Sequence, residues 1–137
     1  MNAIARSLLL AICIVVSTSV FAQNSSSNKA PQYKVDPYWP KPLPNNWILG
    51  QVSGVATDKN DHVWIIHRPM TITDDEKGAT LSPRRSKCCI PAPPVLEFDK
   101  KGNLLQAWGG PGNGYDWPKN EHGIYIDPNG YVWIGGN

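Results

Sequence analysis

The sequence has almost no excess of charge of either sign. Among 137 residues, 13 lysines and arginines face 11 aspartates and glutamates, for a formal net charge of +2 at pH 7. This balance is too small to indicate a nucleic-acid groove or a basic membrane-binding patch. Apolar runs are also short, since the longest, Leu8 to Val16, falls below the roughly 20 residues that a bilayer span needs. We therefore expect no nucleic-acid partner and no membrane span in the mature chain.

Cysteine is scarce, with three in the chain. Cys13 lies in the N-terminal apolar run, so only the adjacent pair Cys88 and Cys89 remains for the folded part. The pair can form a strained vicinal disulfide, stay as two thiols, or bridge to cysteines outside this chain. Metal binding by the pair is disfavoured because no further Cys or His lies nearby in the sequence.

Residues 1–22 are typical of a secretory signal peptide. Arg6 precedes the apolar run, and small residues lead to a cleavage point after Ala22. A retained N-terminal anchor is the alternative, which the shortness of the run disfavours. We expect a secreted or periplasmic protein.

The composition favours short strands and tight turns over a helical bundle. The chain holds 12 glycines, 13 prolines and 6 tryptophans. Residues 23–46 are predicted to be a flexible leader followed by a proline-rich strap, with Tyr38 and Trp39 packing on the domain.

An internal repeat organises residues 47–137. Gly54, Asp58, Asn60 and Trp64 recur 69 positions later as Gly123, Asp127, Asn129 and Trp133. Each copy reads as strand, turn and strand, and residues 95–108 between them form another such unit.

Four antiparallel strands per repeat indicate an all-β fold built from β-propeller blades, about two of them, with an inserted loop at 69–94. A β-sandwich is the competing architecture, but it does not need the repeat to recur in register. Because a propeller closes with four to eight blades, we expect the sequence to be the front part of a longer protein, inactive by itself.

Two side chains of the repeat are expected at the same mouth of the propeller. Arg68 ends the second strand of the first unit, and His122 precedes the innermost strand of the next. Arg68 suits the carboxylate of a small-molecule or peptide substrate, or a rim ion pair. His122 suits a metal ion, or a hydrogen bond to a neighbouring loop.

Other polar and aromatic residues have simpler expected roles. His62 is expected to be exposed, and His62 and His67 are expected on opposite faces of a strand, so that they do not share an ion. Glu121 is expected as an exposed loop carboxylate, and the alternative is that it accepts a hydrogen bond from His122 or acts as a base. Trp64 and Trp133 are expected in sheet packing.

Two family resemblances follow from these residues. The stretches Gly54 to Trp64 and Gly123 to Trp133, with Phe98 to Gly102 between them, resemble NHL-repeat six-bladed propellers. The stretch from Gly50 through His67-Arg68, and then His122-Gly123, resembles the lyase domain of peptidylglycine α-amidating enzymes. That family is a zinc-dependent propeller that splits a peptidyl-α-hydroxyglycine into a peptide amide and glyoxylate.

The resemblance implies roles for four residues. Arg68 would be the active-site arginine, and His122 one of three zinc-ligating histidines. The main-chain carbonyls of Val55 and Ile124 would face a structural calcium ion. The family's other zinc histidines, its tyrosine base and its calcium-binding aspartate are not found in this sequence, and the insert with Cys88 and Cys89 departs from the family.

Two other functions stay open. A non-catalytic propeller that binds a protein or a glycan at its mouth would hold no tightly bound zinc. A calcium-dependent lactonase-like propeller would need acidic ligands at the mouth, which Arg68 and His122 fit poorly.

Overall fold

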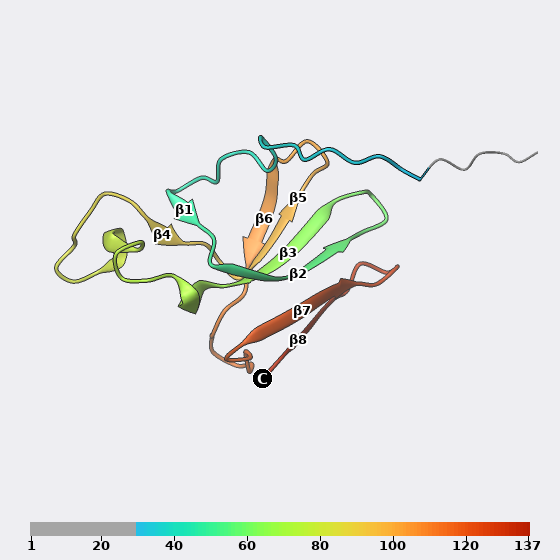
Figure 1. The fold of residues 1–137 in the computed structure, drawn as a ribbon. Helices are drawn as coiled ribbons and strands as arrows, with labels where there is room; N and C mark the ends of the chain where they lie inside the picture. Colours follow the sequence, from blue (N-terminus) through green and yellow to red (C-terminus); the bar gives the residue numbers. More distant parts are fainter. Residues whose placement is uncertain (1–29) are drawn as a thin grey trace, which may run out of the picture. The chain divides into compact units, whose positions relative to one another are not determined.

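Strands and turns dominate the structure, a computed structural model that describes residues 30–137 (Figure 1). The chain divides into two units, Met1–Val35 and Asp36–Asn137, and all strands of the described part belong to the second. The predicted signal peptide and most of the predicted leader lie outside the described residues. Within those residues, no helix is long and apolar enough to cross a membrane.

The second unit contains one four-stranded antiparallel sheet and two smaller pairs of strands. The four-stranded sheet follows chain order, β2 (Gln51–Thr57), β3 (Val63–Arg68), β5 (Val95–Phe98) and β6 (Leu104–Trp108). A hairpin of β7 (Glu121–Ile126) and β8 (Val132–Gly136) follows, and β1 (Trp47–Ile48) pairs in parallel with β4 (Ile90–Pro91). The predicted all-β fold is confirmed. The sheets are open, with no closed ring in the described part of the chain.

The predicted repeat corresponds to a repeated turn. Asp58 Oδ1 accepts main-chain N–H bonds from Asn60 at 2.8 Å and His62 at 3.0 Å, and its Oδ2 accepts from the Trp64 indole at 3.3 Å. The equivalent Asp127 makes the same three bonds at 2.8, 2.9 and 3.3 Å. One carboxylate thus closes the turn and orients the tryptophan of the next strand in both units.

The same turn brings the chain into the left-handed region three residues after the aspartate. Gly130 has φ +91° there, and Asp61, at the equivalent position of the first unit, has φ +61°. Glycine meets this requirement without a Cβ clash, and aspartate is among the few other residues that tolerate it.

The core lies on both faces of β3 and β5, the two central strands of the sheet. On one face, Trp64, Ile66 and Val95 pack with Ile126 of β7. On the other, Ile65, Leu96 and Phe98 form a second cluster. The alternation follows from the two-residue period of a strand and explains why β3 is an almost continuous apolar run.

The proline-rich strap covers the second cluster. The Trp39 ring lies 5.6 Å from the Phe98 ring, centroid to centroid, at an interplanar angle of 57°. Trp39 therefore packs as predicted, whereas the prediction for Tyr38 is wrong, since that side chain is 86% exposed.

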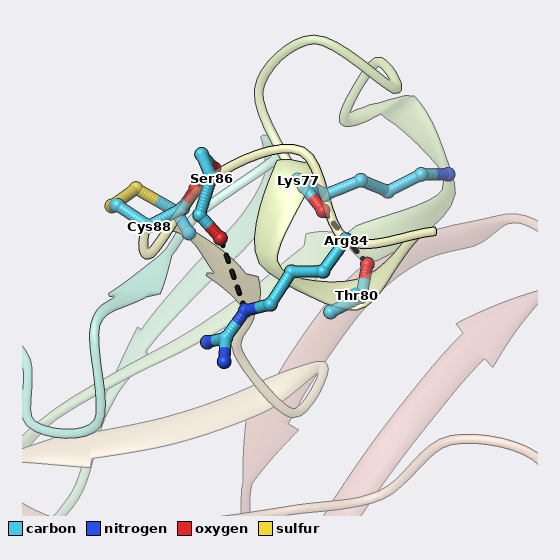
Figure 2. The surroundings of a disulfide bond; sticks show 6 residues. Lys77, Thr80, Arg84, Ser86 and Cys88 are labelled. Carbon is cyan, nitrogen blue, oxygen red and sulfur yellow. Dashed lines mark hydrogen bonds between the residues drawn. A yellow bond between two sulfur atoms is a disulfide. The ribbon is translucent and has the colours of Figure 1, made fainter. Parts of the chain in front are cut away.

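The insert at 69–94 has local structure of its own. It contains two 3₁₀ turns, η1 (Pro69–Thr71) and η2 (Gly78–Thr80), and it ends in β4, which pairs with β1. Figure 2 shows the disulfide that joins Cys88 and Cys89, together with the hydrogen bond from Arg84 Nε to the Ser86 carbonyl at 3.0 Å. Of the alternatives for the cysteine pair, the structure contains the vicinal disulfide.

Candidate functional site

Arg68 and His122 are in contact at one end of the four-stranded sheet. Arg68 Nε donates to the Glu121 carbonyl at 2.8 Å, and Nη2 lies 3.3 Å from His122 Nδ1. Two packing features produce the contact. β3 runs antiparallel to β2, which returns Arg68 to the start of β2 opposite Gln51, and β7 packs against both strands. The expectation that both side chains reach the same end is met, although they are 54 residues apart in the sequence.

The hydrogen bonds assign the proton on the His122 ring. A guanidinium only donates, so Nδ1 accepts from Arg68 and the proton is on Nε2. Nε2 then donates to the Asn137 side-chain oxygen, 2.6 Å away. His122 is exposed, and it is a neutral imidazole with both nitrogens in use.

A β-bulge directs His122 to this position. The register of β7 against β8 shifts between Glu121 and Gly123, and that of β2 against β3 shifts at the equivalent place, between Val52 and Gly54. His122 therefore occupies the bulge position that Ser53 occupies in the first unit. A bulge adds one unpaired residue to a strand and redirects its side chain, so the repeat itself creates a position for a functional side chain at this end of each unit.

Val55 and Ile124, the predicted calcium-facing residues, lie on β2 and β7, which pack closely. A Cβ added to Gly54 would lie 3.0 Å from Gly123 Cα and 3.0 Å from Ile124 N, so the two backbones are in near contact. Val55 is exposed and Ile124 is half-buried. The structure brings the two strands together without testing the calcium role.

Glu121 is buried, which corrects its prediction as an exposed loop carboxylate. It is 4% exposed, begins β7, and accepts a hydrogen bond at Oε1 from the Trp117 indole at 2.7 Å. Its Oε2 is buried without a hydrogen-bond partner in the described residues. An unsatisfied buried polar atom costs about 1–3 kcal/mol, and more when it is charged, so an unpartnered carboxylate oxygen calls for an explanation.

A cavity of about 310 Å³ has Glu121 among its lining residues. Four prolines, Met70 and Trp117 give it apolar walls, and Lys119 and Glu121 are its charged residues. Sequence reasoning missed this cavity because its walls come from irregular segments that have no periodic pattern. The clustering of prolines on both sides of the Trp117 segment was the available signal.

His67 has a structural role. It is fully buried, its Nδ1 accepts from the Gly50 main chain at 3.1 Å, and its Nε2 donates to the Pro93 carbonyl at 3.0 Å. Burial lowers the pKa of His67 below its ordinary value because the charged form loses hydration, although the Pro93 carbonyl and the Glu121 charge oppose this shift. With both nitrogens bonded inside the core, His67 is unsuited to bind an added ion.

His62 is half-buried at the other end of the sheet, which corrects its prediction as an exposed residue. Its Nδ1 lies 2.7 Å from Glu97 Oε1 and 3.3 Å from Asp58 Oδ2. The three side chains are close enough to hold a metal ion. Each already has hydrogen-bond partners, however, because Asp58 closes the turn and Gln106 Nε2 donates to Glu97 at 2.5 Å. Hydrogen bonding between His62 and the two carboxylates is a sufficient explanation.

The two repeated tryptophans differ in burial. Trp64 is 6% exposed in the core between the sheet and the hairpin, as the prediction of sheet packing requires. Trp133 is 61% exposed, so the same prediction is wrong for the second copy. Among the described residues, no further sheet covers that face of β8.

The chain matches no protein-family model, and no curated protein is significantly similar to it. The resemblance to NHL propellers and to amidating lyases therefore stays a prediction from the sequence.

Proposed function

We propose that this chain forms blades of an NHL-type propeller and contributes Arg68 and His122 to the mouth of a zinc-dependent lyase similar to the amidating lyases. The observation that carries the proposal is the 3.3 Å contact between Arg68 Nη2 and His122 Nδ1. It supports the proposal because the family resemblance requires these two residues in one site. The meander β2-β3-β5-β6, with the next hairpin packed on β2, is the arrangement expected of neighbouring blades.

The residues present fit a zinc ion only in part. A neutral imidazole is a suitable ligand, but zinc must replace either Arg68 at Nδ1 or Asn137 at Nε2. Replacement at Nε2 is the easier change, because Asn137 is an exposed side chain that can rotate. A catalytic zinc takes three protein ligands as a rule. Of the two described histidines at this end, His67 has both ring nitrogens bonded in the core, so His122 is the one that is available. When bound, zinc would acidify the hydroxyl group of the substrate.

Arg68 is well placed to bind an anionic substrate group. Its Nε is fixed to the Glu121 carbonyl, which orients the guanidinium, and its Nη1 has no hydrogen-bond partner in the described residues. A guanidinium fixed in this way can donate to a carboxylate with little loss of side-chain entropy. The expected substrate is a small molecule or peptide that carries a carboxylate, as a peptidyl-α-hydroxyglycine does.

Two measurements on the purified protein test this proposal. Zinc content after equilibration with excess zinc and gel filtration should fall in His122→Ala relative to the wild type, and an unchanged stoichiometry would remove His122 from the ligand set. Glyoxylate, the carboxylate product, should shift the Arg68 side-chain NMR signals, and Arg68→Gln should weaken its binding about tenfold or more. Glyoxylate binding that is equal in both proteins would contradict the proposed role of Arg68.

A non-catalytic module that binds a protein or a glycan is the second candidate. Three large side chains on the β7–β8 hairpin are exposed by more than half: Tyr125, Tyr131 and Trp133. Exposed aromatic side chains gathered on one element are typical of interaction surfaces. This function would be favoured if the wild-type protein held no zinc and if Trp133→Ala no longer bound a partner that the wild type binds.

We also propose export, since the predicted signal peptide and the Cys88–Cys89 disulfide both suit an oxidising compartment.

A further inference from the structure

The Cys88–Cys89 disulfide does not act as a structural cross-link. A disulfide stabilises a fold mainly by closing a loop of the unfolded chain, and the effect grows with the length of that loop. The two cysteines are adjacent in the sequence, so the bond closes no loop and joins no second segment to the insert. The bond is therefore better explained by its reactivity than by its contribution to stability.

Hydrogen bonds hold this part of the insert without help from the sulfur atoms. The Gly78 carbonyl accepts from the Ser86 N–H at 3.3 Å, and the Ser86 hydroxyl donates to the Cys88 carbonyl. On the other side of the pair, the Ile90 N–H donates to the Asn46 carbonyl at 2.9 Å. None of these bonds involves a cysteine side chain, so they can persist when the S–S bond is opened.

The disulfide is open to solvent and belongs to a loop that carries free positive charge. Cys88 is exposed and Cys89 is half-buried, and Figure 2 shows the sulfur atoms pointing away from the η2 turn. Lys87 directly precedes the pair, and Arg84 is tied to the same loop because its Nε donates to the Ser86 carbonyl at 3.0 Å. Both cations are exposed, and neither forms an ion pair in the described part of the chain.

The other charged side chains of the insert are already engaged. Lys77 lies 3.1 Å from Asp74, and Arg85 lies 3.8 Å from Asp75. Glu76 accepts hydrogen bonds within its own turn, ahead of η2. The two cations of the cysteine loop are therefore left without a counter-charge of their own.

We propose that the Cys88–Cys89 disulfide is a thiol-exchange site that accepts two electrons from small anionic thiols. A thiolate attacks one cysteine sulfur, a bond forms between the two sulfurs, and the Cys88–Cys89 bond breaks with its electron pair on the other cysteine. A second thiolate attacks the reagent sulfur of this mixed disulfide, which releases the oxidised reagent as its own disulfide. Two protons from solvent then convert the two cysteine thiolates into thiols.

Positive charge favours this reaction in two ways. It raises the local concentration of an anionic thiolate, and it stabilises the cysteine thiolate that leaves. The proposal involves neither Arg68 nor His122, so its failure and the failure of the proposed lyase function are separate results.

The experiment compares three thiols of similar size on the purified protein at low ionic strength. Their reacting forms are a dianion, a monoanion and a zwitterion: 2-mercaptoethanesulfonate, 2-mercaptoethanol and cysteamine. Mass spectrometry after alkylation follows the reduction of Cys88 and Cys89, and each rate is divided by that of the same thiol with a small neutral disulfide. The dianion should then be favoured about tenfold over the zwitterion, and high salt should reduce this preference. Equal normalised rates, or no reduction by any of the three thiols, would overturn the proposal.

Variants locate the effect. Arg84→Gln combined with Lys87→Gln should reduce the preference to about threefold or less. Lys59→Gln is the matched control, since it removes an exposed charge from the β2–β3 turn and should leave the preference unchanged. An undiminished preference in the double variant would refute the role of the two cations, and the three-thiol comparison in the wild type decides if that variant does not fold.

Thermal unfolding separates exchange from a structural role. The reduced and oxidised proteins should unfold within a few degrees of each other, because the hydrogen bonds that hold the loop do not involve the sulfurs. A melting temperature that falls by about 10 °C or more on reduction would show a structural cross-link and contradict the proposal.

Discussion

Replacing Gly54 by alanine perturbs the seam between the sheet and the hairpin. The added Cβ would lie 3.0 Å from Gly123 Cα, 3.0 Å from Ile124 N and 3.0 Å from Ile66 Cγ2. Two of these neighbours are backbone atoms of β7, and Ile66 is fully buried, so none of the three moves aside easily. Overpacking of this kind typically costs about 1–3 kcal/mol. We expect Gly54→Ala to lower the free energy of unfolding by that amount.

Gly123→Ala provides the matched control. Gly123 is the repeat equivalent of Gly54 and also lies in a strand, but a Cβ there would meet no heavy atom within 4 Å. Alanine in a strand interior is favoured over glycine by roughly 0.5–1 kcal/mol, so this variant should be neutral or slightly stabilised. Urea unfolding followed by tryptophan fluorescence measures both values. Equal stability of the two variants would refute the close packing of β2 on β7.

Three further predictions concern the turns, the buried histidine and the cysteine pair. Asp58→Ala should destabilise the protein by about 1–3 kcal/mol in urea unfolding, because three hydrogen bonds to its carboxylate are lost, and an unchanged midpoint would contradict the role of this turn. Stability should fall as the pH drops below about 6.5, because the unfolded chain protonates His67 before the folded one does, and a folded His67→Gln should show a flatter profile there. Intact-mass measurement should show a gain of two hydrogens on reduction of Cys88 and Cys89, whereas no gain would mean free thiols.

Much of the fold could be predicted from the sequence because the turns carry strong local signals. An aspartate that caps its own turn fixes where a strand ends and the next begins, so Asp58 and Asp127 predicted where β2 and β7 end and where β3 and β8 begin. The placement of Arg68 and His122 at the same end was also predictable, since it requires only strand direction and the repeat, whereas their contact was not predicted.

The rest depends on tertiary contacts that leave no local pattern. From the sequence, Glu121 is expected to be an exposed polar residue. It is buried instead, because the indole of Trp117, four residues earlier, donates a hydrogen bond to its carboxylate. Trp64 and Trp133 occupy the same position of the repeat, but only Trp64 has an element packed over it among the described residues. The bulge that redirects His122 was equally invisible, because one unpaired residue hardly changes the alternation of a short strand.

The adjacency of β2 and β7 brings Arg68 and His122 into one site, and proton NMR tests it most directly. A Cβ on Gly54 would lie 3.0 Å from Gly123 Cα, so the α-protons of the two glycines must be close neighbours. A strong nuclear Overhauser effect between the α-protons of Gly54 and Gly123 is expected in the folded protein. Assigned α-protons that show no such effect would contradict the packing of the two strands, and with it the shared site.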